Sequence, residues 1–118
     1  MTVWVDDMYS VPMGQFRRMK MSHLISDNEK ELHAMAGKIG VARRWYQGDH
    51  YDICLSKRAL AISLGAVEVT MRQLAGISYC LREGIQFDTP AEAYKELRLL
   101  HNRQRPRGKS KLGAMANG

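Results

Sequence analysis

The tetrapeptide Asp49-His50-Tyr51-Asp52 is the part of the sequence around which we expect the fold to be arranged. It directly precedes Ile53-Cys54-Leu55, an apolar segment that returns the chain to the core. Two earlier segments are able to converge on it: the β-rich stretch 2–5, which ends at Asp6, and the segment that contains His23. The sequence therefore predicts a small α/β domain with a polar pocket.

The composition is that of one globular domain. The chain has 118 residues, which is enough to bury a core without disulfide bonds. Hydrophobic residues make up 45% of it and charged residues 25%, as in ordinary globular proteins. No apolar run approaches the roughly 20 residues that span a bilayer, and the N-terminal residues lack the layout of a signal peptide. We therefore expect a cytoplasmic protein with no membrane partner.

The net charge of +6 is concentrated near the C-terminus. From residue 102 onward there are five of the 18 basic residues and none of the 12 acidic ones, so the first 101 residues carry 13 basic against 12 acidic residues. The segment 104–118 is Gly-rich and has no hydrophobic periodicity, which predicts a disordered basic tail. Such a tail either binds nucleic acid electrostatically or only keeps the chain soluble. The candidate nucleic-acid-binding residues are Arg103, Arg105, Arg107, Lys109 and Lys111.

Residues 19–25 alternate in a way that predicts a strand with His23 on one face and Lys20 on the other. A lone histidine on a mostly apolar face is either a hydrogen-bonded core residue or a catalytic group. The preceding residues, 8–18, keep neither the strand period nor the helix period, which predicts a partly packed loop. A loop of that length suits a flap over the pocket.

Capping signals predict where the helices begin and end. Ser26 at an N-cap and Glu29 three residues later form a capping box, and Gly40 suits the left-handed C-cap of the helix that follows. Residues 41–46 are expected to form a short strand or an extended loop. A shorter helix is expected at 56–64, with both of its later leucines turned toward the core.

The C-terminal part is predicted to form two helices. Thr70 begins a second capping box, and Gly84 ends the helix that it starts. Thr89-Pro90 combines an N-cap with proline at the first helical position, which predicts a helix over 90–103. The expected fold class is α/β, with a small single-layer sheet of about four strands flanked by helices. We expect one domain over 1–103.

Four polar side chains form the candidate catalytic set. His50 and Asp52 stand at i and i+2 in an extended segment, so both project to the same side and the carboxylate is able to orient the imidazole. Groups of this kind carry out general acid and base catalysis or hold a divalent metal ion. A second interpretation is a structural network that ties a loop to the sheet, because buried polar groups need partners. The candidate catalytic residues are Asp6, His23, His50 and Asp52.

Basic and aromatic residues are candidates for substrate binding. Arg43 and Arg44 stand beside Trp45, and two arginines clamp a phosphate or carboxylate while a ring stacks on the ligand. The same residues equally suit a solvated rim around one buried tryptophan. Lys20 is the fourth candidate. A basic rim of this kind favours a phosphate-bearing substrate.

Six motifs occur in one order along the chain. They are Val5-Asp6-Asp7, Met21-Ser22-His23-Leu24, Asp27 to His33, Gly40 to Trp45, His50-Tyr51-Asp52 and Gly65-Ala66-Val67. In this order they resemble a family of small bacterial and phage proteins, domain of unknown function family 4031, over about residues 2–75. The family has no assigned activity, and the short Met-rich form resembles its phage branch, which implies the host cytoplasm. The resemblance implies a recurring pattern that includes Asp6, His23, His33, Arg44, His50 and Asp52.

The sequence pattern of a strand that ends in Asp, followed later by Gly-Ala-Val-Glu-Val-Thr, is also similar to that of PIN-like ribonucleases. Those enzymes have further acids after the later strand. Here Met71, Arg72 and Gln73 follow instead, so the metal-binding quartet of that family is incomplete.

Two hypotheses of function follow. The first is an enzyme, a nuclease-like phosphoester hydrolase or transferase that acts on nucleic acid or on a phosphorylated small molecule, with a divalent metal as a compatible cofactor. The second is a non-catalytic phage or bacterial accessory protein that binds and modulates a host protein. It would do so through the Met and aromatic residues of 8–21, with His50 and Asp52 as a structural network.

Overall fold

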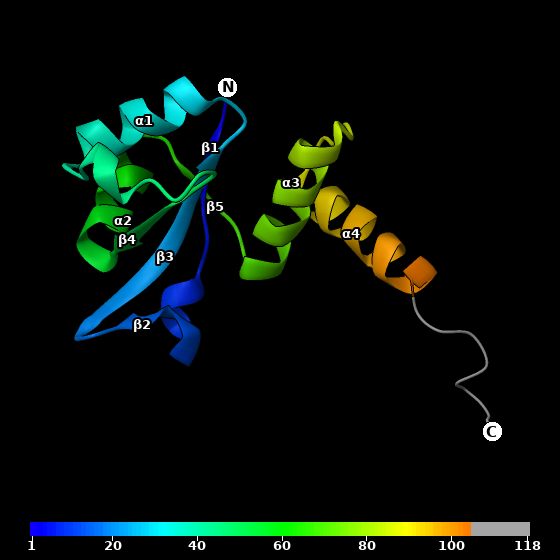
Figure 1. Ribbon diagram of the computed structural model, residues 1–118, viewed down its shortest axis with the longest axis horizontal. Helices are drawn as coiled ribbons and strands as arrows, with labels where there is room; N and C mark the ends of the chain where they lie inside the picture. Colours follow the sequence, from blue (N-terminus) through cyan, green and yellow to red (C-terminus); the bar gives the residue numbers. More distant parts are fainter. Residues whose placement is uncertain (105–118) are drawn as a thin grey trace.

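The computed structural model describes residues 1–104, and these form a mixed α/β fold (Figure 1). One five-stranded sheet is flanked by four helices. The two C-terminal helices pack against each other. The predicted fold class is therefore confirmed. Residues 105–118, which include the candidate residues Arg105, Arg107, Lys109 and Lys111, lie outside the described part of the chain.

Five strands form the sheet: β1 (Val3–Val5), β2 (Gln15–Phe16), β3 (Met19–Ser26), β4 (Tyr51–Cys54) and β5 (Val67–Glu68). β3 is the centre, because it pairs antiparallel with β1, β2 and β4, whereas β5 pairs parallel with β1. The register places His23 of β3 opposite Asp52 of β4, and Leu24 opposite Tyr51.

Four helices cover the two faces of the sheet: α1 (Glu29–Lys38), α2 (Leu55–Ser63), α3 (Met71–Glu83) and α4 (Pro90–Gln104). α1 and α2 lie on one side of the strands, and α3 and α4 lie on the other (Figure 1). Each side has its own hydrophobic core, one that includes Val5 and Leu32 and one that includes Trp4 and Ile77. None of the helices within residues 1–104 is long and apolar enough to span a membrane.

The alternation of strand side chains separates apolar from polar positions. Successive residues of a strand point to opposite faces of the sheet. Leu24 and Tyr51 enter the core beneath α1 and α2, so their neighbours His23 and Asp52 face the side of α3 and α4. One face of the sheet thus presents His23 and Asp52, two of the candidate catalytic residues.

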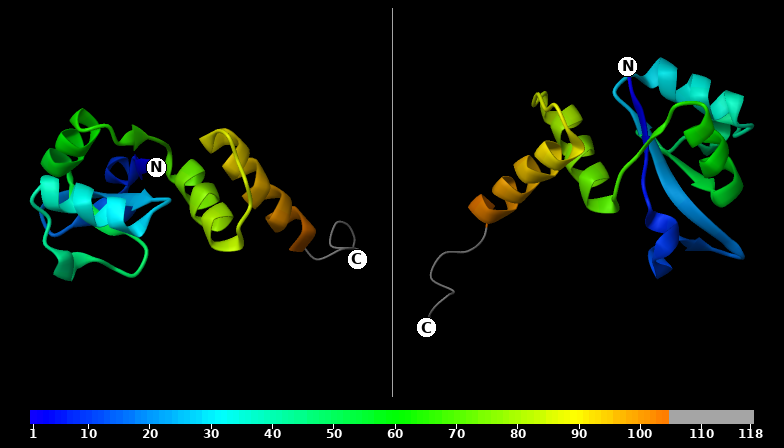
Figure 2. Two further views of the ribbon diagram at one scale, coloured as in Figure 1. Left: turned by 90° about the horizontal axis from the view of Figure 1, so that it is seen from above. Right: turned by 180° about the vertical axis from the view of Figure 1, so that it is seen from behind.

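The α3–α4 hairpin is held together by a close backbone approach, and it lies beside the sheet (Figure 2). A Cβ atom at Gly76 of α3 would lie 2.5 Å from the backbone N and Cα atoms of Tyr94 in α4. Only glycine leaves room for this contact. The hairpin docks on the sheet through Trp4, whose ring centroid lies 6.1 Å from that of Phe87.

The capping signals of the two C-terminal helices are confirmed. Thr70 and Gln73 form a reciprocal capping box at the start of α3, and Gly84 ends this helix with a φ of 71°. At the start of α4, the amide of Glu92 donates a hydrogen bond to Thr89 Oγ1. These signals are local, so the sequence is sufficient to predict them.

The predicted N-cap of α1 is wrong by two residues. Asn28, not Ser26, caps the helix, and its Oδ1 accepts a hydrogen bond from the amide of Glu31. Ser26 still belongs to β3, and its hydroxyl donates to the carbonyl of Thr2 while it accepts from the amide of Asn28. Strand pairing therefore extends through the residue that the sequence pattern assigned to the helix cap.

The predicted inward face of α2 is also wrong. Leu60 and Leu64 are 40% and 46% exposed, whereas Arg58 is buried. Burial of Arg58 is tolerated because its guanidinium donates to the carbonyl of Asp6 at 2.9 Å and to Glu68 at 3.2 Å. A partnered arginine thus takes the inward position.

Two connecting segments contain short 3-10 turns. Residues 8–18, predicted as a loop, contain the turns η1 (Met8–Ser10) and η2 (Pro12–Gly14) as well as β2, which forms a hairpin with β3. Residues 41–46 contain the turn η3 (Arg43–Trp45) rather than a strand.

Candidate functional site

Asp6 follows the last residue of β1 and is fully buried. Its Oδ1 accepts hydrogen bonds from the amides of His23 and Met8, at 2.8 and 3.2 Å. Its Oδ2 lies 2.7 Å from His23 Nδ1. An ionised carboxylate only accepts hydrogen bonds, so His23 Nδ1 is the donor. Asp6 therefore fixes the orientation of the His23 ring.

His50 is held in a similar way by its neighbour Asp49. His50 Nδ1 lies 2.6 Å from Asp49 Oδ1. The loop that carries both residues is closed by a 2.9 Å hydrogen bond from the amide of Gln47 to the carbonyl of His50. Within this loop Gly48 has a φ of 93°, a conformation that favours glycine. The loop positions a second imidazole beside a carboxylate.

Both imidazoles converge on Asp52. Its Oδ1 lies 3.5 Å from His50 Nε2 and 3.9 Å from His23 Nε2, and the two rings meet edge to face with centroids 5.2 Å apart. Asp52 Oδ2 accepts a 2.9 Å hydrogen bond from Gln47 Nε2. Oδ1 is buried and has no hydrogen-bond partner among the described residues. His23, His50 and Asp52 thus offer three ligand atoms that lie within 4.8 Å of one another.

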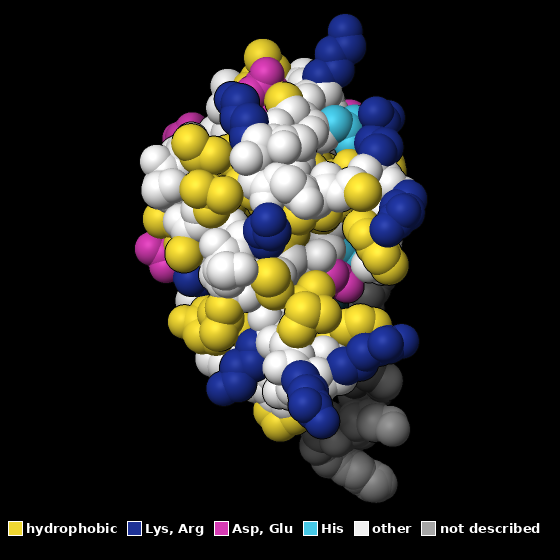
Figure 3. All heavy atoms as spheres, turned by 90° about the vertical axis from the view of Figure 1, so that its left-hand side faces the viewer, with side chains coloured by type: hydrophobic (Ala, Val, Ile, Leu, Met, Phe, Trp, Pro, Cys, Tyr) yellow, Lys and Arg dark blue, Asp and Glu magenta, His cyan; other side chains and the backbone are white. Residues whose placement is uncertain are grey.

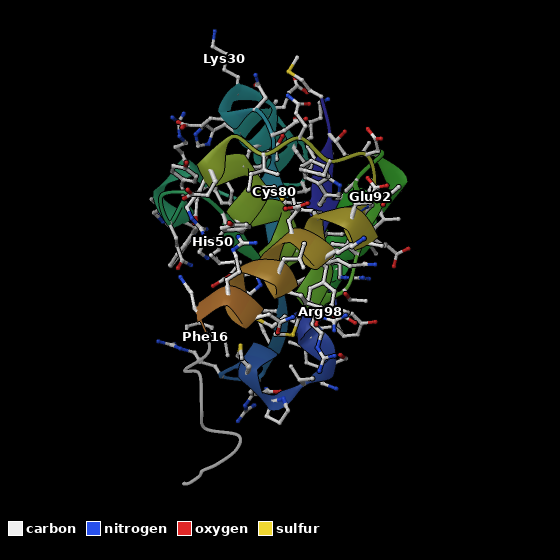
Figure 4. All side chains as sticks on the ribbon, turned by 90° about the vertical axis from the view of Figure 1, so that its right-hand side faces the viewer. Phe16, Lys30, His50, Cys80, Glu92 and Arg98 are labelled. Atoms are coloured by element: carbon white, nitrogen blue, oxygen red, sulfur yellow. The ribbon has the colours of Figure 1, made fainter. Side chains whose placement is uncertain are left out.

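A cavity of about 290 Å³ adjoins this group. It lies between the sheet and α3, and Figure 4 shows His50 beside the α3–α4 hairpin. Its polar wall comes from the residue after β1, from β3 and from the loop before β4, and α3 supplies most of its apolar wall. The lining residues are Asp6, His23, Ile25, Asp49, His50, Met71, Leu74, Ala75 and Ser78.

Asp7 ties α3 to the end of β1. Its Oδ1 accepts a 2.9 Å hydrogen bond from the amide of Met71, the first residue of α3. Two consecutive carboxylates therefore serve the two walls of the cavity. Asp6 orients His23 in the polar wall, and Asp7 holds the helix that forms the apolar wall.

The site combines several carboxylates with a histidine of increased basicity. The hydrogen bond with Asp6 raises the pKa of His23 above its ordinary value, burial opposes this effect, and the negative charges of Asp6 and Asp52 add to the increase. Arg58 donates to the Asp6 carbonyl, and its guanidinium lies 4.7 Å from the ring centroid of Tyr9. Carboxylates around two imidazoles make the site suited to positive charge.

The four candidate catalytic residues lie in or next to the cavity. The candidate substrate-binding residues are exposed and do not line it: Lys20, Arg43, Arg44 and Trp45. Lys20 precedes His23 by three positions in β3, so strand alternation turns its side chain to the opposite face. Arg43 to Trp45 form η3, the turn that precedes the Asp49–His50 loop. Arg103 is exposed near the end of α4.

Sequence reasoning missed several supporting residues. One of them is Asp49, which directly precedes His50 and lies nearer to its ring than Asp52, the carboxylate that the sequence pattern emphasised. Arg58 is a single basic residue in the inward stripe of α2, which is a recognisable sign of a buried, partnered charge. The wall formed by α3 carried no polar signal, because Met71 and Leu74 are ordinary core residues in sequence.

His33 lies in a different cluster, on the opposite face of the sheet. Its Nδ1 lies 2.7 Å from the hydroxyl of the buried Tyr51, and its Nε2 lies 3.3 Å from Glu29. The ring of Tyr46 meets that of His33 edge to face at 4.6 Å. This network joins α1 to β4 and has no part in the cavity.

Comparison with known proteins identifies the family. A family model described as "Protein of unknown function (DUF4031)" matches residues 3–80, as the sequence motifs predicted. The chain belongs to this family. The DUF4031 match includes most of α3 and every residue that lines the cavity, whereas α4 lies beyond it. No curated protein and no solved structure matches the chain.

Proposed function

We propose that the cavity beside His23, His50 and Asp52 is the active site of a phosphoester hydrolase or transferase. The observation that carries the proposal is the convergence of two carboxylate-bound imidazoles on the buried Oδ1 of Asp52. Leaving a buried charged acceptor without a partner costs stability, which favours a functional reason for the arrangement. A cavity with a few convergent polar groups is the usual form of a small-molecule site.

In the proposed reaction, a water molecule or another hydroxyl attacks phosphorus, the ester P–O bond breaks, and the leaving oxygen takes a proton. The protein must help to deprotonate the attacking group and must offset the negative charge on the phosphate oxygens. Imidazole and carboxylate groups are suited to these tasks, either by proton transfer or through a bound cation.

A basic hairpin supports a phosphate-bearing substrate. Residues 8–26 contain no acid, and Arg17 and Arg18 form the exposed two-residue tip between β2 and β3. Arg17 has a φ of 56°, a conformation that non-glycine residues rarely adopt. A guanidinium group is able to donate two parallel hydrogen bonds to the oxygens of one phosphate. The tip is therefore suited to contact a non-reacting part of a substrate such as an oligonucleotide.

An activity assay with conservative variants tests the proposal. The full chain is assayed, with divalent metal salts present, on bis(p-nitrophenyl) phosphate and on short RNA and DNA oligonucleotides. His50→Ala and Asp52→Asn should each lower kcat/KM by at least about 100-fold, the usual size of an acid–base contribution. Their side chains are 22% and 32% exposed, so we expect both variants to fold.

His33→Gln is the matched control, because it removes an imidazole from the opposite face of the sheet. Its activity should equal that of the unchanged chain. No turnover of any of the three substrates, or equal turnover in all variants, would contradict the proposal. A large loss of thermal stability in Asp52→Asn would instead favour the structural network.

A second candidate function is the binding of another protein by the surface around η2 and β2. Large hydrophobic side chains are exposed there, namely Val11, Met13, Phe16 and Met19. Figure 3 shows hydrophobic side chains interspersed with Lys and Arg on the side of the molecule that it faces. Under this hypothesis, the double change Met13→Ser and Phe16→Ser abolishes partner binding, measured by co-purification, without altering phosphoester turnover. Partner binding that survives the change would rule this surface out.

A further inference from the structure

The hydrogen bonds of the two site histidines determine which ring nitrogen carries the proton. His23 Nδ1 lies 2.7 Å from Asp6, and His50 Nδ1 lies 2.6 Å from Asp49. An ionised carboxylate has no hydrogen to donate, so in both pairs the proton is on Nδ1. In a neutral imidazole, each Nε2 atom then holds a lone pair.

The two lone pairs face the same carboxylate oxygen. His50 Nε2 and His23 Nε2 lie 3.5 and 3.9 Å from Asp52 Oδ1. Both separations exceed the roughly 2.7–3.2 Å of an ordinary N–H···O hydrogen bond. Oδ1 is also shielded from solvent and accepts no hydrogen bond from the described residues. When both imidazoles are neutral, as metal ligands must be, three electron-pair donors therefore share one small space, an arrangement that a cation stabilises.

We propose that His23 Nε2, His50 Nε2 and Asp52 Oδ1 bind a divalent transition-metal ion. Ligand atoms at about 2.1 Å from an ion lie about 3.4 Å apart in a tetrahedral site and about 3.0 Å apart in an octahedral one. One ligand atom from each of the three residues lies within 4.8 Å of the other two, and the distances from His50 Nε2 and His23 Nε2 to Asp52 Oδ1 are 3.5 and 3.9 Å. Side-chain shifts of under about 1 Å bring the set to ligand distance.

The surrounding hydrogen bonds match those of protein metal sites. A histidine ligand usually donates its other ring N–H to a carboxylate or a carbonyl, which fixes its orientation and increases its basicity. Asp6 does this for His23, and Asp49 does it for His50. Asp6 is in turn held by two backbone amides. The two imidazoles are therefore oriented before any ion binds.

The donor set selects the class of metal. Two imidazoles and one carboxylate suit Zn²⁺, Fe²⁺, Co²⁺ or Mn²⁺, whereas Mg²⁺ and Ca²⁺ prefer oxygen ligands. Three protein ligands leave coordination positions for water or substrate, and the cavity adjoins the group. An ion bound here would activate water and polarise a phosphate oxygen.

The metal site goes beyond the proposed function and does not depend on it. A bound ion would join β3, β4 and the preceding loop in a non-catalytic protein as well. Metal binding is therefore measured without substrate. If the chain binds the metal ion but does not turn over phosphoesters, the enzyme proposal is wrong and the metal site stands. If it turns over phosphoesters without binding the metal ion, the metal site is wrong and the enzyme proposal stands.

Titration of the metal-free full chain with Co²⁺ tests the site, because the visible absorption of this ion reports its ligands. One equivalent should bind. His50→Ala and Asp52→Asn should each weaken binding by at least about 100-fold, since loss of even a supporting partner usually costs 10–100-fold. Asp49→Asn should weaken Co²⁺ binding by about 10-fold, because it removes only the carboxylate that orients the His50 ring. Circular dichroism checks that each variant is folded.

Two further variants act as controls. His33→Gln removes the imidazole of the opposite face, and Cys54→Ser removes a partly exposed thiol. Both should bind Co²⁺ as the unchanged chain does. No saturable binding, or unchanged affinity in both His50→Ala and Asp52→Asn, would overturn the proposal. Loss of binding in Cys54→Ser would assign the ion to the thiol and would overturn it too.

Discussion

At the scale of single residues, Asp6 has the largest predicted effect on stability. It is fully buried and accepts three hydrogen bonds, from two amides and one imidazole. Asp6→Ala leaves these donors without a partner, so we expect a loss of about 3–5 kcal/mol in the free energy of unfolding, measured by urea denaturation. Asp6→Asn keeps the shape and one acceptor and should lose less. Equal losses in the two variants would contradict this expectation, because they would show that a neutral acceptor of the same shape recovers none of the stability.

The two cysteines should differ in reactivity. A hydrogen bond with Ser56 lowers the pKa of the partly exposed Cys54 thiol, and amides at the start of α2 contribute, whereas burial raises the pKa of Cys80. Because the thiolate is the reactive form, iodoacetamide near neutral pH should alkylate Cys54 well before Cys80. The rate at Cys54 should rise with pH through a midpoint below that of free cysteine, as followed by peptide mass mapping. Equal rates at both thiols would contradict this.

The sequence identified site residues more readily than it identified their partners. His50 and Asp52 are two residues apart in an extended segment, so their common side is a local property. The pairing of Asp6 with His23 joins β1 to β3 and depends on the register, which the sequence of neither strand defines alone. The same alternation that turns His23 toward the cavity turns Lys20 to the other face.

At the scale of elements, Gly76 determines how closely α3 and α4 pack. A Cβ atom there would lie 2.5 Å from backbone atoms of Tyr94, which cannot move without moving α4. Gly76→Ala should therefore destabilise the chain by about 1–3 kcal/mol, measured by thermal or urea unfolding. Gly37 of α1 is the matched control, because a Cβ there meets nothing within 4 Å. Gly37→Ala should stabilise the chain by up to about 1 kcal/mol. A similar loss in both variants would contradict the packing argument.

Helix boundaries were predictable where the signal is local. The Thr70 capping box and the turn at Gly84 involve residues a few positions apart. The cap of α1 was mispredicted because Ser26 pairs with Val3, a contact across the sheet that extends β3. The inward face of α2 was mispredicted because Arg58 finds partners in Asp6, just after β1, and in Glu68 of β5, which a hydrophobicity pattern does not contain.

At the scale of the whole molecule, we predict that the sheet and the α3–α4 hairpin unfold together as one domain. Trp4 lies between them, near Phe87, and Trp45 is the second tryptophan of the chain. In the Trp45→Phe variant, Trp4 fluorescence and far-UV circular dichroism should therefore give the same urea midpoint. An earlier fluorescence transition would show that the hairpin detaches first and that the chain has two units.

The general architecture followed from the order of predicted strands and helices, but the cavity did not. α3 has an apolar stripe that includes Leu74 and Ile77. The sequence does not show which face of the sheet such a stripe covers, because it would pack on either one. Its position over the polar face is fixed by contacts between distant residues, among them the packing against Trp4 and the hydrogen bond between Asp7 and Met71, which are 64 positions apart.

That contact has a consequence for the order of assembly on the ribosome. Synthesis proceeds from the N-terminus, and the proposed ligands His23, His50 and Asp52, with Asp6, all precede residue 53. The amide that Asp7 binds belongs to Met71, which is made later. The residues of the polar group are therefore synthesised before the helix that covers them. We expect an ion to enter more rapidly before α3 docks on the sheet than after it has docked.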